Sequence, residues 1–189
     1  APSIHMIRVD VDTQISPMVG GEQQSIDLIG YLNSHAGRLK EKTYTLEERL
    51  RLCSTVRALT EAWFPDGDYD PQMYGACFES YLTESEIYVE LDRPEDALDS
   101  LRKAVDTTET MKASAGQDGI HTAPFMTTFC RKFEFWPGSL AYEMKHYLKY
   151  TGRDDNGIIQ YFKDERAKAF AETAGYKEQM ARFETLCGE

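Results

Sequence analysis

Residues 71–112 contain two amphipathic segments joined by a very short turn, and this arrangement strongly limits the possible folds. The first, "PQMYGACFESYLTESEIYVEL", repeats its apolar and small residues every three or four positions, which predicts a helix. The second, "DRPEDALDSLRKAVDTTE", has Asp92 as the expected N-cap and Pro94 in its first turn. Helices joined by so short a connection pack as an antiparallel pair. The chain is therefore expected to be built from antiparallel helix pairs.

The spacing of small and large residues in this pair resembles a known helical repeat, the tetratricopeptide repeat. The residues concerned are Tyr81, Ser85 and Tyr88 on the first helix, and Ala97, Leu101 and Ala104 on the second. Small residues let two helices approach closely, and large residues fill the grooves beside them. Asp92 stands where the turn of that family usually has glycine. The alternative is an ordinary helical bundle with coincidental small residues.

Further helices are predicted on both sides of this pair. Apolar stripes in "EQQSIDLIGYLNSHAGRLKEK" and "TLEERLRLCSTVRALTEAWF" predict a first pair over residues 22–64. The second stripe runs through Leu46, Leu50, Cys53, Val56, Leu59 or Thr60, and Trp63. Thr45 and Glu48 form the expected capping box before it. Downstream, helices are expected from Ser139 to Tyr150 and at about 155–162, 164–173 and 176–186, with Gly175 and Gly188 as terminators.

The predicted fold is all-α, with four consecutive parts. Residues 1–20 form an extended N-terminal segment, in which "MIRVDVD" alternates like one short strand. Residues 21–112 form the tetratricopeptide-like helix pairs. Residues 113–138 are an irregular, aromatic-rich segment packed against the helices, and residues 139–189 are C-terminal helices of the same domain.

The acidic composition excludes several classes of partner. The formal net charge is -11, and affinity for nucleic acids or anionic membranes rests on basic residues. Apolar runs are far shorter than the roughly 20 residues that a membrane span needs. Four cysteines without a C-x-x-C motif favour a reducing cytoplasm. The chain does not begin with methionine, so it is expected to be a processed chain or a fragment.

One stretch, "EAWFPDGDYDPQMYG", suggests a metal site because Asp66, Asp68 and Asp70 alternate as at the start of an EF-hand calcium loop. That loop also needs glycine at its sixth position and glutamate at its twelfth. Pro71 and Cys77 stand there instead. The stretch is therefore interpreted as a turn, in which Asp70 caps the following helix and Pro71 takes its first position.

Other catalytic or metal-binding motifs are not found in the sequence. The four histidines (His5, His35, His121 and His146) are far apart and have no cysteine at zinc-ligand spacing. There is no G-x-S-x-G motif and no glycine-rich phosphate loop. Cys53 and Cys77 lie on apolar helix faces, where cysteine is usually a small buried hydrophobe. We therefore expect no metal, no cofactor and no enzymatic activity.

A longer resemblance extends over roughly residues 22–187. The segments "FPDGDYDPQMYGACFESYLTESEIYVELDRPEDALDSLRKAV", "GIHTAPFMTTF" and "YFKDERAKAFAETAGYKEQMARFE" resemble the C-terminal part of XRE-type bacterial transcription regulators, mostly from Firmicutes. Those proteins place tetratricopeptide-like repeats after a helix-turn-helix, which this chain lacks. The resemblance implies a cytoplasmic sensor domain that binds a signalling peptide or a protein and self-associates. A stand-alone adaptor or scaffold is the alternative.

The expected binding surface is the concave groove that the first helix of each pair lines. If Tyr81, Ser85 and Tyr88 pack inward, the groove residues are Asn33, Glu79, Glu86 and Val89. An asparagine amide can clamp a peptide backbone because it both donates and accepts hydrogen bonds. Glu79 and Glu86 would favour a basic peptide. The alternative is that these are ordinary solvated positions.

Overall fold

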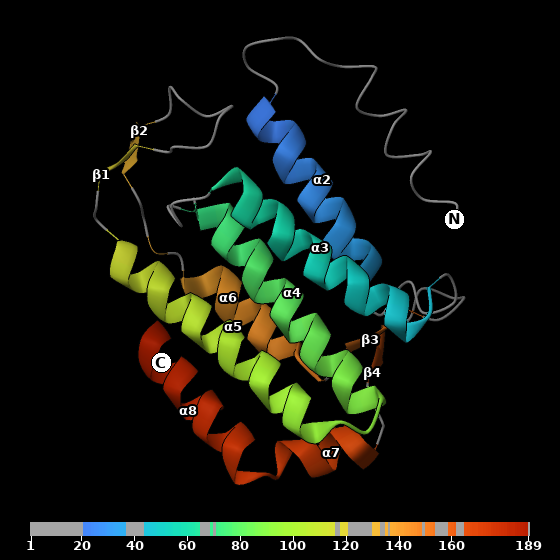
Figure 1. Cartoon of the computed structure of the whole chain (residues 1–189). Coiled ribbons are helices and arrows are strands. Elements are labelled where there is room, and N and C mark those ends of the chain that lie inside the picture. The colour runs from blue at the N-terminus through green and yellow to red at the C-terminus, as the bar shows by residue number, and fades with distance from the viewer. Residues whose placement is uncertain are drawn as a thin grey trace.

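A computed structural model describes residues 21–36, 44–64, 69, 71–115, 118–120, 130–132, 135, 137–148, 150–153, 159–161 and 165–188. In these ranges the chain is mainly helical, which confirms the all-α class (Figure 1). The predicted extended segment 1–20, with its "MIRVDVD" strand, lies outside the described residues, as do Asp66, Asp68 and Asp70 of the aspartate-rich stretch.

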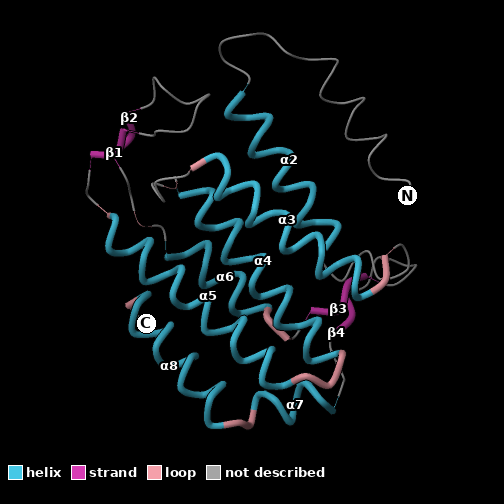
Figure 2. Tube along the Cα trace, in the orientation of Figure 1, coloured by secondary structure: helices cyan, strands magenta, loops and turns pink. Residues whose placement is uncertain are grey.

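Four long helices lie side by side in the order of the chain (Figures 1 and 2). They are α2 (Gly21–Ala36), α3 (Leu46–Trp63), α4 (Pro71–Glu90) and α5 (Pro94–Ser114). Three shorter helices follow: α6 (Pro137–His146), α7 (Glu165–Ala171) and α8 (Ala174–Cys187). Helix α6 packs against α4, and α8 packs along α5 on the side away from α3 (Figure 1). Helix α4 therefore has neighbours on several sides.

Two short β-hairpins correct the prediction for the second half of the chain. Strand β1 (Asp118–Ile120) pairs antiparallel with β2 (Cys130–Lys132), so the segment 113–138 is not wholly irregular. Strand β3 (Tyr150–Arg153) pairs antiparallel with β4 (Ile159–Tyr161), so the helix predicted at about 155–162 is wrong. Threonine, isoleucine and tyrosine in β3 and β4 favour strands, which explains the difference. The helix predicted from Ser139 to Tyr150 instead begins at Pro137 and ends at His146.

The start of α3 was predicted correctly, but its buried face was only partly predicted. The Glu48 amide donates to Thr45 Oγ1 at 3.2 Å, and the Thr45 amide donates to Glu48 Oε2 at 2.8 Å, which confirms the capping box. The fully buried side chains of α3 are Arg49, Cys53, Val56 and Thr60. An arginine thus takes the place that apolar periodicity assigned to Leu50, which is only half-buried.

The α4–α5 pair makes the close approach that its small residues predict. Ser85, Ala97, Leu101 and Ala104 are all fully buried. Ser85 Oγ donates to the Ala97 carbonyl at 2.6 Å, so the two helices touch directly where both carry a small residue. Tyr147, after α6, places its hydroxyl 2.6 Å from the same Ser85 Oγ. The small residue at position 85 therefore joins three parts of the fold.

The turn between α4 and α5 differs from the prediction at Asp92. This residue does not cap α5, because its backbone has a φ of 57°, in the left-handed region. The Arg93 amide donates to the Tyr88 carbonyl at 2.9 Å, and the Asp92 amide donates to the Val89 carbonyl at 3.1 Å. These two bonds form a Schellman ending of α4, in which the left-handed position usually carries glycine. The N-cap of α5 is Arg93, whose guanidinium lies over the Tyr88 ring.

Replacing Asp92 with glycine is expected to raise the free energy of unfolding by about 0.5–1 kcal/mol, because glycine adopts a positive φ without steric cost. The change also removes a negative charge from the carbonyl end of α4, which adds to the gain. Asp92→Asn removes the charge but retains a side chain, so the difference between the two variants isolates the backbone contribution. Urea unfolding measures both. A glycine variant that is less stable than the parent would contradict this description of the turn.

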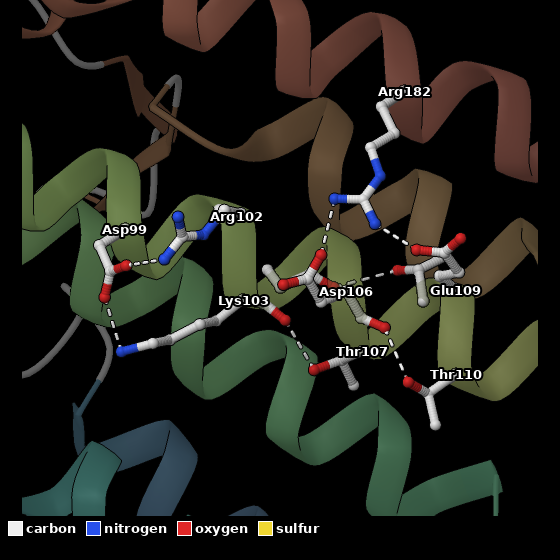
Figure 3. Close-up of polar contacts among 10 residues, drawn as sticks. Asp99, Arg102, Lys103, Asp106, Thr107, Glu109, Thr110 and Arg182 are labelled. Carbon is white, nitrogen blue, oxygen red and sulfur yellow. Dashed lines mark hydrogen bonds and ion pairs between the residues drawn. The ribbon is translucent and has the colours of Figure 1, made fainter.

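The C-terminal helices pack onto the same core as α4 and α5. Their buried residues Leu140, Met144, Ala167, Phe170 and Phe183 belong to one cluster with those of α4 and α5. Arg182 of α8 also donates to Asp106, at 2.6 Å, and to Glu109, both on α5 (Figure 3). Gly188 has a φ of 79° and ends α8 as predicted. Gly175 lies inside α8 and terminates nothing, because Thr173 is the N-cap.

Candidate functional site

A pocket of about 270 Å³ lies between α2, α4 and α6. Its lining residues are Ile29, Gly30 and Asn33 from α2, Met73, Gly75, Ala76 and Glu79 from α4, and Ser139, Leu140 and Glu143 from α6. Two of the predicted groove residues, Asn33 and Glu79, therefore lie together in one hollow. No added Cβ atom at Gly30 or Gly75 would meet an atom within 4 Å, so both glycines border open space.

Asn33 is the polar centre of this pocket. Its side chain is only 3% exposed because Ile29, Leu32 and Ala36 hold the same side of α2 in the core. The Asn33 amide nitrogen donates to the Ala76 carbonyl at 3.0 Å and to Glu79 Oε2 at 3.3 Å. Among the described residues, no donor reaches the Asn33 carbonyl oxygen, Oδ1, although it is buried. A buried acceptor without a donor is costly, so this atom favours a ligand that can donate a hydrogen bond.

Two carboxylates share the pocket with this amide. Burial, and to a lesser extent the negative charge of Glu143, raise the pKa of Glu79 to about 7, against the opposing effect of the hydrogen bond from the Asn33 amide. Desolvation also raises the pKa of Glu143, against the influence of His146 one turn later. Within the described part of the chain, no lysine or arginine forms an ion pair with Glu79 or Glu143. The pocket therefore holds negative charge that this part of the protein does not neutralise.

The other two predicted groove residues, Glu86 and Val89, do not line this pocket. Glu86 is half-buried, and its Oε1 accepts a hydrogen bond from the Leu148 amide at 2.8 Å, so this carboxylate holds the chain just after α6. Val89 is 3% exposed and belongs to the main hydrophobic cluster, so its prediction as a groove residue is corrected. Helices α6 and α7 both pack against α4, and they cover the part of its surface that the prediction left open.

A second hollow, of about 600 Å³, lies on another side of α4, between α3 and α5. Three of its four charged residues, Arg57, Lys103 and Asp106, are already paired within the chain, and the fourth is the exposed Glu61. Arg57 donates to Glu84 at 2.6 Å and lies over the Tyr81 ring, and Lys103 lies 2.6 Å from Asp99. Asp106 accepts from Arg182 (Figure 3). Most of these charges are satisfied, whereas the α2–α4–α6 pocket has a buried acceptor, Asn33 Oδ1, without a donor among the described residues, so that pocket is the better candidate for a ligand.

The described residues offer little for other chemistry. They contain no group of three histidine, cysteine or acidic side chains that could hold a metal ion. Burial raises the pKa of Cys53 to about 12 and that of Cys77 to about 11, so both thiols stay protonated near neutral pH and make poor nucleophiles. No described helix combines the length and hydropathy that a membrane crossing requires.

Sequence reasoning missed the contribution of α6 to this site. Glu143 lies in a predicted helix, but nothing in the sequence indicates that this helix packs against α4. The glycines carried a usable signal, because an isolated glycine inside a helical pattern often has a packing or functional reason. Gly30 and Gly75 are such residues, and both border the pocket.

Comparisons with known proteins do not assign the chain to a family. No family model matches it, and no solved structure matches it. Over 32 residues it is 56% identical to stage IV sporulation protein A of Bacillus subtilis (strain 168) and, equally, to that of Bacillus anthracis. This similarity covers 17% of the chain and only 6% of the length of either relative.

Proposed function

We propose that the chain is a non-catalytic interaction domain that binds a peptide or protein segment in the pocket between α2, α4 and α6. The supporting observation is the Asn33 amide, whose nitrogen is held by Ala76 and Glu79 while its oxygen has no donor among the described residues. A backbone N–H or a side-chain donor of an incoming peptide would satisfy that oxygen. The open space beside Gly30 and Gly75 gives such a segment room.

The proposal extends to a tetratricopeptide-like pairing of α2 with α3 and of α4 with α5, in the sensor domain of an XRE-type regulator. The close contact of Ser85 with Ala97 supports this pairing. So does the glycine-like backbone of Asp92, because the family's turn usually has glycine at that position. The competing proposal is a stand-alone adaptor. The upstream reading frame of the parent gene distinguishes the two, since a helix-turn-helix before Ala1 would support the regulator.

Filling the pocket tests the proposed binding surface. Peptides selected from a random phage-displayed library on the unmodified protein are expected to bind Gly75→Leu at least roughly tenfold more weakly, a loss of about 1.4 kcal/mol. The matched control is Gly138→Leu, because Gly138 also borders open space but lies outside the pocket. Fluorescence anisotropy with labelled peptides measures both. If the peptides bind Gly75→Leu and Gly138→Leu equally well, the pocket is not the binding surface. A library that yields no binder would contradict peptide binding.

A second candidate function follows from the 32-residue similarity to stage IV sporulation protein A. It favours a role for the chain in sporulation, with the helical part serving as the interaction domain. Immunoblotting across a growth and sporulation time course tests this candidate. Accumulation confined to sporulating cells would support it, and constant levels in cells that never sporulate would contradict it.

A further inference from the structure

The pocket between α2, α4 and α6 presents hydrogen-bond acceptors from three helices around one small space. These are the carboxylates of Glu79 and Glu143 and the side-chain oxygen of Asn33, which is buried in the wall of the pocket. The amide nitrogen of Asn33 is already used, since it donates to Ala76 and Glu79. What the pocket offers a ligand is therefore acceptors and negative charge, and the complementary group is a cation that donates hydrogen bonds.

The size of the pocket limits what that cation can be. About 270 Å³ lies just below the roughly 300–1,000 Å³ of ordinary small-molecule sites, so one side chain or a small amine fits better than a larger ligand. Ile29, Met73 and Leu140 add apolar surface to the lining. An alkyl chain that ends in an ammonium group matches both parts. The ammonium group carries three donors around a compact charge, so it can donate to acceptors on three helices at once. The planar guanidinium group of arginine fits such an arrangement less well.

The electrostatics of the pocket favour the same ligand. Burial holds the pKa of Glu79 near 7, so its ionised form lacks adequate stabilisation. The titratable groups around it are Glu143 and, through Glu143, His146 on α6, while the described side chains of α2 contribute only the neutral Asn33 amide to the lining. A net charge of -11 also raises the local concentration of cations around the whole protein.

We propose that this pocket binds an alkylammonium group, held by Glu79, Glu143 and Asn33 Oδ1. The inference rests on the proposed function, in which the ammonium group is a lysine side chain of the bound peptide. A free small amine offers the same chemistry, and the experiment separates the two sources. The pocket thus selects a lysine at one position of the ligand.

The first experiment titrates the ¹⁵N-labelled protein with n-butylammonium chloride and follows backbone amide shifts. Shifts are expected at residues 29–33, 73–79 and 139–143. Affinity is expected to be at least roughly tenfold higher at about pH 8 than at about pH 5.5, because Glu79 is ionised only at the higher pH while the amine is protonated at both. Glu79→Gln and Glu143→Gln should each weaken binding. Glu178→Gln, on the exposed surface of α8, should leave binding unchanged.

The second experiment uses a library-selected peptide and a copy in which norleucine replaces its lysine. At least a roughly tenfold preference for the lysine peptide, lost in Glu79→Gln, is expected. This inference would be overturned if the peptide binds equally well with lysine or norleucine and butylammonium causes no localised amide shifts. The proposed function would still stand in that case. Localised butylammonium binding with no peptide binder would overturn the peptide as the source and assign the pocket to a free amine. If neither Glu79→Gln nor Glu143→Gln weakens butylammonium binding, the result would overturn the proposal that these two carboxylates hold the ammonium group.

Discussion

Replacing Arg49 with alanine is expected to lower the free energy of unfolding by about 3–5 kcal/mol. The Arg49 side chain is fully buried in α3, its Nε donates to the Ala36 carbonyl at 2.6 Å, and its Nη1 lies 3.9 Å from Glu90 Oε2. Ala36 ends α2 and Glu90 ends α4, so one cation connects the last residues of two helices. The alanine variant leaves the last carbonyl of α2 without this donor and Glu90 without this cation.

Urea unfolding measures this loss, and Arg51→Ala is the matched control. Arg51 is exposed on the same helix, so its replacement should change stability by no more than about 0.5 kcal/mol. The double variant Arg49→Met with Glu90→Gln removes both charges together and should recover much of the loss, because a buried ion pair contributes little compared with an apolar pair of similar volume. A single alanine variant that costs less than about 1 kcal/mol would contradict the role assigned to Arg49.

Replacing Glu79 with glutamine is expected to stabilise the protein above pH 7 by about 2 kcal/mol, because a buried carboxylate with a raised pKa is unfavourable when ionised. The folded pKa of about 7 lies above the ordinary value of 4.5, so between these values the folded chain binds the proton more tightly than the unfolded chain. The contribution of Glu79 to stability is therefore largest below pH 4.5 and falls as pH rises through 7. Glutamine keeps an oxygen that can accept from the Asn33 amide.

The measurement is the difference in unfolding free energy between Glu79→Gln and the parent, taken across this pH range. The difference should grow with pH and level off above the folded pKa. Glu178→Gln, on the exposed surface of α8, is the control. A flat difference for Glu79→Gln would contradict the burial of the Glu79 carboxylate in the α2–α4–α6 pocket.

Local patterns in the sequence predicted the helices better than the contacts between them. The capping box at Thr45, the bounds of α4 and the close packing at Ser85 all depend on residues within one helix or one hairpin, and the structure confirms them. The errors at β3 and β4 came from a stretch whose short apolar runs fit a helix or a strand equally well.

The buried charges could not be predicted by the same reasoning. Arg49 occupies a core position only because two helix ends meet there, and this meeting depends on tertiary packing. The candidate site shows the same limit. Asn33 and Glu79, on the first helices of the two predicted pairs, line one pocket, whereas Val89 is buried because α6 and α7 pack on α4 in positions that the sequence did not indicate. Long connections precede both of those helices, and no local pattern specifies where they dock.

Helix α4 contributes to both large hydrophobic clusters of the described chain. Phe78 and Leu82 belong to the cluster with α5–α8, and Met73 belongs to the cluster with α2 and α3. Neither cluster can lose its packing without exposing apolar surface of the same helix. Unfolding should accordingly be one cooperative transition, and the amide protons of α4 should exchange with solvent only as fast as the whole domain opens. A ligand that binds beside Glu79 would then slow the opening of both halves of the molecule, including parts that it never touches.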